Sequence, residues 1–319
     1  MLDLIIANML ENISLFKKYW MPLFIIISIF YVAYYISSQF GRIDNVISLS
    51  LAPLAGSAIF QFIFWAVSSY LWSMALVIVS SRKISLIDSF FQLCLVNLGK
   101  YIPGKIWGVF ARGSYLKQYH NIDIGKIIQA TYIEQIYLLG SGAILASLIF
   151  ATMNPGPLLW VAAPIISLVI IIATVYQKPL VAFIRVVTRV GKLDTNYEVN
   201  NFKMPVMQQL FMLAMYILVW LLLSMVLYGL YLALFEVDIS YHMAAIMVLS
   251  CVAGMIAGFI AIFSPGGIGV REAVSGAILA NYMPTSDAIL LVLLFRIWLA
   301  SLEITVGGAL YLRSRKQLG

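Results

Sequence analysis

The sequence contains few residues of the kinds that carry most enzymatic chemistry. Only 10% of its 319 residues are charged, and it has two cysteines and two histidines. Cys94 and Cys251 stand in apolar stretches without a Cys-x-x-Cys motif or a nearby histidine, so we expect small packing residues. His120 and His242 form no cluster of metal ligands. These patterns argue against a disulfide framework and a metal site, and no cofactor is expected.

Several motifs with a defined chemistry are also missing. The chain has no P-loop to power an ATP-driven pump, no Rossmann fingerprint and no His-Glu-x-x-His motif. Lys17 and Lys18 follow the first apolar stretch, and no small-residue cleavage site comes after the next one, so a cleavable signal peptide is not expected. Glu236 and Asp238 form the only outer acidic pair, which is a weak signal for the metal-binding loop of a membrane glycosyltransferase.

Hydrophobic residues, in contrast, make up 63% of the chain, and the mean hydropathy is +0.98. These values predict an all-α polytopic membrane protein, with about six full spans and two broken, re-entrant helical hairpins. The full spans are expected at residues 21–38, 54–79, 127–152, 158–176, 206–235 and 288–312. Amphipathic or interfacial helices are expected at residues 2–16 and 181–190.

The two broken segments cover residues 85–116 and 241–282, and each has a Pro-Gly break inside an apolar stretch. The breaks are Pro103-Gly104 and Pro265-Gly266-Gly267, which free backbone groups that hydrocarbon tolerates only beside protein or a wet cavity. We expect Ser264 to cap the second half-helix, with Pro265 at its first position. A hairpin fits the first segment, whereas a hairpin or two short spans fit the second.

The order of elements predicts an inverted repeat. Each half, residues 1–152 and residues 153–319, reads as two spans, a broken segment and a third span. Three full crossings per half is an odd number, so the second half is inverted relative to the first. Fourteen of the twenty basic residues then fall on the cytoplasmic flanks, which places both termini in the cytoplasm and the protein in the cell (inner) membrane.

Five further basic residues lie within the predicted membrane region, against three acidic residues. The basic ones are Lys100, Lys105, Arg112, Arg271 and Arg296, and the acidic ones are Glu134, Glu272 and Glu303. A charge at the bilayer centre costs roughly 2.5–3.5 kcal/mol on insertion scales. Even if every acid is paired, two cations are left over, and an anion such as a phosphate would complement them. Glu134, Arg296 and Glu303 are candidates for ion pairing or proton coupling.

Two stretches carry a resemblance to a known family: Leu98-Gly99-Lys100-Tyr101-Ile102-Pro103-Gly104-Lys105-Ile106-Trp107 and Ser264-Pro265-Gly266-Gly267-Ile268-Gly269-Val270-Arg271-Glu272. Both resemble stretches of the lysylphosphatidylglycerol synthase transmembrane-region, or flippase-like domain, family. The resemblance extends to the order of spans. It implies movement of aminoacylated phospholipids or lipid-linked sugars between leaflets, with Lys100, Lys105, Arg271 and Glu272 as candidate headgroup contacts. The family's lipid-aminoacylating members carry a soluble catalytic domain after this region, whereas this chain ends at Gly319. The resemblance therefore implies a stand-alone translocator and no aminoacyl transfer.

The leading hypothesis is a lipid flippase, not an enzyme, that binds an anionic headgroup between the two broken segments. The candidate substrate-binding residues are Lys100, Pro103, Gly104, Lys105, Arg112, Pro265, Gly266, Gly267, Arg271 and Glu272. A proton-coupled transporter of a small anion and a membrane glycosyltransferase, or its partner, are the alternatives. A lipid-modifying enzyme or glycosyltransferase and a second copy of the chain stay open as protein partners. Nucleic acid is excluded because the basic residues lie between hydrophobic stretches.

Overall fold

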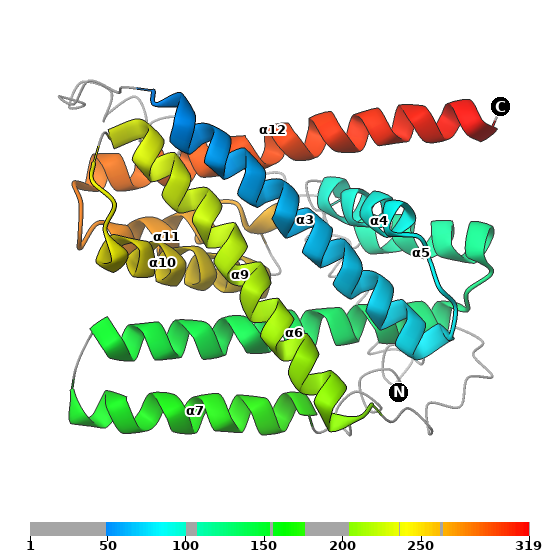
Figure 1. The fold of residues 1–319 in the computed structure, drawn as a ribbon, viewed down its shortest axis with the longest axis horizontal. Helices are drawn as coiled ribbons and strands as arrows, with labels where there is room; N and C mark the ends of the chain where they lie inside the picture. Colours follow the sequence, from blue (N-terminus) through cyan, green and yellow to red (C-terminus); the bar gives the residue numbers. More distant parts are fainter. Residues whose placement is uncertain are drawn as a thin grey trace, which may run out of the picture.

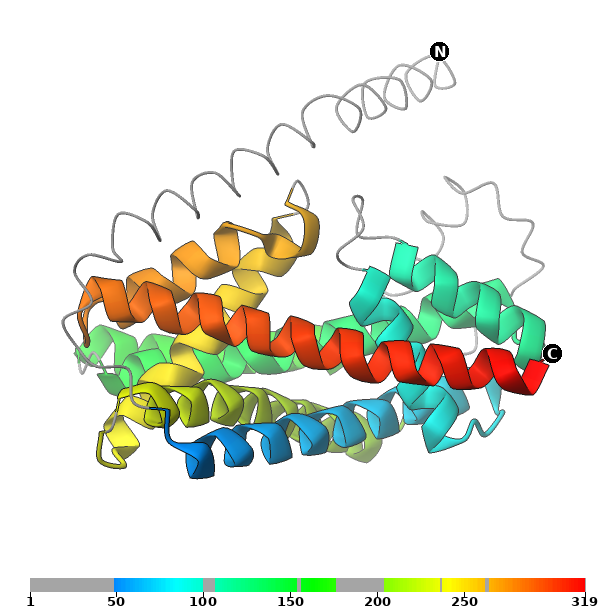
Figure 2. The same ribbon diagram turned by 90° about the horizontal axis from the view of Figure 1, so that it is seen from above.

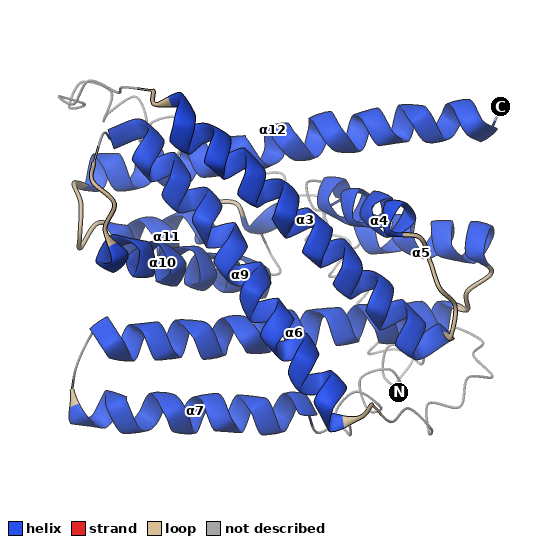
Figure 3. Ribbon diagram, in the orientation of Figure 1, coloured by secondary structure: helices blue, strands red, loops and turns tan. Residues whose placement is uncertain are grey.

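A computed structural model describes residues 49–99, 107–153, 156–175, 204–235, 237–261 and 264–318. Within these ranges the secondary structure is entirely helical (Figures 1 and 3). The helices are α3 (Leu51–Ser80), α4 (Leu86–Gly99), α5 (Trp107–His120), α6 (Ile124–Met153), α7 (Pro157–Val175), α9 (Val206–Phe235), α10 (Tyr241–Ile260), the short 3₁₀ helix η3 (Pro265–Gly267), α11 (Val270–Leu279) and α12 (Thr285–Leu318).

Five of these helices, α3, α6, α9, α10 and α12, are long and apolar enough to cross a membrane. The protein is therefore a polytopic helical membrane protein, as the composition predicts. Helices α3, α6, α7, α9 and α12 cover five of the six predicted full spans, and α9 has the predicted bounds. The span expected at residues 21–38 and the helices expected at residues 2–16 and 181–190 lie outside the described residues.

The first broken segment consists of α4 and α5, which pack against each other. Each has 14 residues, or ~21 Å of helix, which is short of the ~30 Å hydrocarbon core. At the base of the pair, the Ser85 hydroxyl accepts a bond from the amide of Asp88 (3.0 Å), and Tyr115 donates to the Asp88 carboxylate (3.2 Å). The bond from Tyr115 ties the start of α4 to the C-terminal part of α5, so the segment enters and leaves on the same side.

The second broken segment has unequal arms. Helix α10 has 20 residues, or ~30 Å, and can cross the membrane, whereas α11 has only 10 residues, or ~15 Å. The turn between them needs positive φ angles at Gly266 (61°), Gly267 (71°) and Gly269 (84°), which glycine adopts without a steric cost. The break is therefore set by this run of glycines after Pro265.

The capping expected at this break is wrong in its details. Pro265 does open η3, but the Ser264 hydroxyl donates to the carbonyl of Ile268 (2.6 Å) and accepts no helix amide. Helix α11 instead begins at Val270, and the Glu272 carboxylate accepts the N–H of Gly269 (2.6 Å). A side chain one turn into α11 thus caps the helix, because the glycine at the N-cap position has no side chain of its own.

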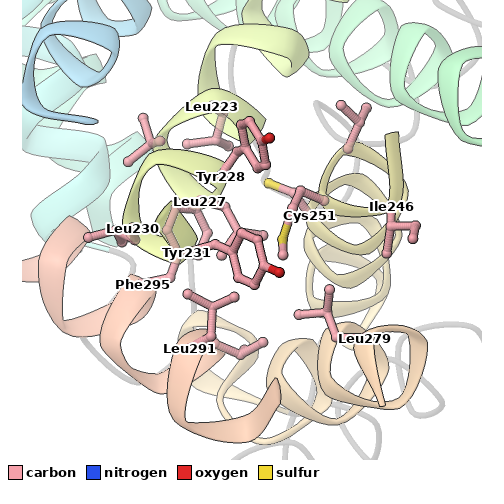
Figure 4. Close-up of a cluster of buried hydrophobic side chains, with 14 of the residues drawn as sticks. Leu223, Leu227, Tyr228, Leu230, Tyr231, Ile246, Cys251, Leu279, Leu291 and Phe295 are labelled. Atoms are coloured by element: carbon pink, nitrogen blue, oxygen red, sulfur yellow. The ribbon is translucent and has the colours of Figure 1, made fainter. Parts of the chain in front are cut away.

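Two buried clusters hold the bundle together. One lies among α9, α10, α11 and α12, where Leu227, Tyr231, Cys251, Leu279 and Phe295 point toward one another (Figure 4). The other joins the C-terminal half of α3 to α6 and to the start of α9. Helices α3 and α9 run side by side along one side of the molecule, and α12 passes along both α4 and α11 (Figure 2). Helix α12 therefore connects the two broken segments.

Close packing explains the Gly-x-x-x-Gly spacing in α10. A Cβ atom added at Gly254 would lie 1.9 Å from Ser275 Oγ, and one added at Gly258 would lie 3.2 Å from Arg271 Cβ. These glycines let α10 approach α11 closely, which is the usual role of this spacing between membrane helices. Cys94 and Cys251 are buried free thiols, which confirms their prediction as packing residues.

Candidate functional site

Four predicted site residues, Lys100, Pro103, Gly104 and Lys105, lie outside the described residues, and their role stays a prediction. The remaining candidates, apart from Glu303, fall in two places. Arg112 and Glu134 meet between α5 and α6. The glycine turn, Arg271, Glu272 and Arg296 gather where α11 meets α12.

Arg112 is an arginine enclosed by protein, with only 1% of its surface exposed. Its Nη1 atom donates to Glu134 Oε2 at 2.6 Å, and its Nη2 atom lies 3.4 Å from Oε1. The guanidinium also lies over the ring of Trp72, 3.7 Å from the ring centroid. Glu134, a candidate for ion pairing or proton coupling, thus forms an ion pair with a cation on another helix. Its charge neutralises that of Arg112, and Trp72 adds a cation–π contact on one face of the guanidinium.

Arg296 forms the second ion pair in the described part of the membrane region. Its Nη1 atom bonds to Oε1 of Glu272 on α11. The other oxygen, Oε2, accepts the Gly269 amide, so one carboxylate serves both as partner of Arg296 and as the cap of α11. The sequence placed Arg296 and Glu303 on one face of a helix. The structure pairs Arg296 with Glu272, and Glu303 lies farther along α12, within electrostatic range of Cys94 in α4.

The two ion pairs occupy corresponding places in the two halves. In each half, the second arm of the broken segment is bonded to the long helix that follows it. The paired residues are separated by 22 positions for Arg112 and Glu134 and by 24 for Glu272 and Arg296. The charges are exchanged: the arm carries the arginine in the first half and the glutamate in the second.

A small cavity adjoins the second ion pair. Its polar lining comes from Arg271, Glu272, Ser275 and Arg296, and its apolar lining includes Leu227 and Phe295. The lining side chains therefore carry two positive charges and one negative charge among apolar neighbours. Since guanidinium groups bind phosphate and carboxylate through paired hydrogen bonds, this lining suits an anion.

Polar side chains on the second and third predicted spans are mostly used within the protein. Ser69 donates to the carbonyl of Trp65 (2.7 Å), and Ser73 donates to the carbonyl of Ile84 (3.2 Å). Gln61 differs, because it is fully buried and neither of its side-chain polar atoms has a hydrogen-bond partner among the described residues.

Trp72 is a contributor that the sequence did not reveal. It donates its ring N–H to Gln92 on α4 (2.6 Å) and also covers Arg112. A tryptophan in a predicted span is usually a core or interface residue, and 40 positions separate it from Arg112, so spacing alone carries no signal for the contact.

A family model for the lysylphosphatidylglycerol synthase TM region matches residues 19–307. The chain belongs to that family. The lysylphosphatidylglycerol synthase TM region is a membrane domain associated with flippase-like handling of lipids, which agrees with a helical membrane protein of several spans. The match confirms the resemblance carried by the two broken segments. A comparison with curated proteins finds no match to the chain.

Proposed function

We propose that this member of the family is a lipid translocator that moves a lipid with an anionic, phosphate-bearing headgroup between leaflets. The observation that carries the proposal is the cavity at the second broken segment, which is lined by Arg271, Arg296 and one carboxylate among apolar side chains. A phosphate supplies the negative charge that this lining favours. The acyl or prenyl chains would stay in the surrounding lipid while the headgroup crosses.

The arrangement of the halves supports alternating access. Corresponding ion pairs join each broken segment to its following helix, as expected for inverted repeats in transporters. Helix α12 carries Arg296 beside α11 and Glu303 toward α4, so it links the two broken segments. Relative rocking of the two halves would expose the headgroup first to one side and then to the other. Lys100 and Lys105 remain candidate contacts from the first segment.

A proton-coupled transporter of small anions is the rival hypothesis. It is less well supported at Glu134, because this carboxylate is buried and already bonded to the guanidinium of Arg112. A lipid-independent uptake that requires a proton gradient would favour this rival.

The test is headgroup flipping in proteoliposomes with fluorescently labelled phosphatidylglycerol. We expect wild-type protein to move the probe, and Arg271→Gln and Lys105→Ala each to reduce the rate by about tenfold, the effect of losing one charged hydrogen bond. Lys117→Gln is the matched control, because Lys117 is exposed at the end of α5, away from the cavity. Unchanged transport in both folded variants would show that this site is wrong.

A further inference from the structure

The carboxylate of Glu272 occupies the position that an anionic ligand of this cavity would take. Its Oε1 atom holds the guanidinium of Arg296, and its Oε2 atom holds the amide of Gly269 at the start of α11. Both partners are hydrogen-bond donors, and both lie where positive charge favours an anion: a guanidinium and the N-terminal end of a helix. Arg271 lines the same cavity beside them.

We propose that the phosphate of the lipid headgroup displaces Glu272 from Arg296 when it enters the cavity. This inference rests on the proposed function and adds the event that admits the substrate. In the observed state Glu272 acts as a built-in competitor, because its carboxylate accepts the hydrogen bond of Arg296 in the absence of substrate. The phosphate then accepts the hydrogen bonds of the Arg296 guanidinium, and the Glu272 side chain moves away from Arg296.

The exchange changes the broken segment because Glu272 also caps α11. Once the carboxylate leaves, the Gly269 amide loses its side-chain partner. This amide follows a turn in which a Cβ atom at Gly267 would lie 2.8 Å from the Cα atom of Gly258, so η3 is held tightly against α10. Loss of the cap therefore acts on the one end of α11 that joins this constrained turn. Headgroup binding is in this way coupled to the conformation of the second broken segment.

The corresponding pair in the first half is not suited to the same exchange. The guanidinium of Arg112 is covered by Trp72 and has 1% exposure, whereas the Arg296 side chain is 19% exposed and borders the cavity. Glu134→Gln therefore provides a matched control, since it makes the same chemical change in a buried ion pair that the substrate does not reach.

The experiment titrates short-chain phosphatidylglycerol into the full chain held in phosphatidylcholine nanodiscs, with inorganic phosphate as a parallel arm. Glu272→Gln removes the competing charge but keeps an oxygen for Gly269, so we expect phosphatidylglycerol to bind about tenfold more tightly. Arg296→Gln should weaken binding by at least about tenfold. Glu134→Gln should leave the dissociation constant within about twofold of wild type. If Glu272→Gln does not fold, Glu272→Asp, whose shorter side chain reaches Arg296 less well, should also tighten binding.

Equal affinity in wild type and Glu272→Gln, or an equal gain in Glu134→Gln, would overturn the exchange. A gain seen with inorganic phosphate and not with phosphatidylglycerol would overturn the assignment to a lipid headgroup. Flipping by the wild type is measured separately in proteoliposomes. If the wild type flips lipid but Glu272→Gln binds unchanged, only the exchange is wrong; if affinities follow the expected order but no lipid crosses, the translocator proposal is wrong.

Discussion

At the residue scale, four of the described charged residues in the membrane region form two ion pairs. Arg112 meets Glu134 from the next helix, and Arg296 meets Glu272 from the preceding arm. The two pairs differ in their surroundings. Trp72 closes the first, and a cavity adjoins the second. We therefore assign the first pair to stability and the second to substrate handling.

Removing the charge of Arg112 tests the first assignment. Arg112→Met leaves Glu134 as a buried carboxylate without its cation, which typically costs about 3–5 kcal/mol. We expect the midpoint of thermal unfolding in detergent to fall by roughly 10 °C. The double variant Arg112→Met/Glu134→Leu should regain most of this loss because no charge remains buried. Equal midpoints for the single variant and wild type would contradict a stabilising role.

The sequence could predict that Glu134 needs a cation, but not which one. A charged residue within an apolar stretch indicates that a partner is needed, because an unpaired charge in the membrane is costly. Which residue becomes the partner depends on how side chains pack between helices. Arg112 lies 22 positions before Glu134, and Trp72 lies a further 40 positions before Arg112. The partner of Arg296 could not be predicted for the same reason. Helix periodicity placed Glu303 on the same face of its helix, whereas the structure pairs Arg296 with Glu272 of α11.

At the element scale, the break in the second segment is a matter of backbone geometry. The prolines and glycines showed where the helices must stop, since they interrupt hydrogen bonding regardless of tertiary context. They did not show that Glu272 would cap α11, because this cap requires the Glu272 side chain to fold back on the start of its own helix while the Ser264 hydroxyl donates to Ile268. Span positions, by contrast, followed hydropathy closely, as for α9.

The hairpin of α4 and α5 depends on a close approach at Gly108. A Cβ atom there would lie 2.6 Å from the carbonyl oxygen of Val96 in α4, so any side chain must push the arms apart. We expect Gly108→Ala to reduce flipping in proteoliposomes by about tenfold and to lower the thermal midpoint by several degrees, as for a strained packing change of about 1–3 kcal/mol.

Gly113→Ala is the control for this prediction. It lies in the same helix, and a Cβ atom there meets no atom within 4 Å. The alanine should leave flipping unchanged and should not lower the midpoint, since alanine favours a helix over glycine. If both variants behaved alike, contact between residue 108 and α4 would not be the cause of the effect at Gly108.

At the scale of the whole molecule, the helix ends sort into two groups. The start of α3 meets the end of α9, where the Ser50 amide donates to the Ala233 carbonyl (2.9 Å). At the opposite end, Arg82 after α3 donates to the carbonyl of His120, the last residue of α5 (2.8 Å). The basic residues Lys83, Lys117 and Lys126 belong to this second end, so the positive-inside rule predicts that it faces the cytoplasm.

Cysteine labelling tests that orientation in a chain whose native thiols are already protected. Cys94 and Cys251 are buried, so a membrane-impermeant maleimide should leave them unlabelled in the folded protein. Asp238 and Lys117 are exposed at opposite ends of the bundle. In intact cells we expect Asp238→Cys to react at once and Lys117→Cys to react only after the membrane is permeabilised. The reverse order would show that the orientation is opposite, and that a headgroup reaches Arg296 from the other side of the membrane. The expected order would show that the second broken segment begins at the outer side.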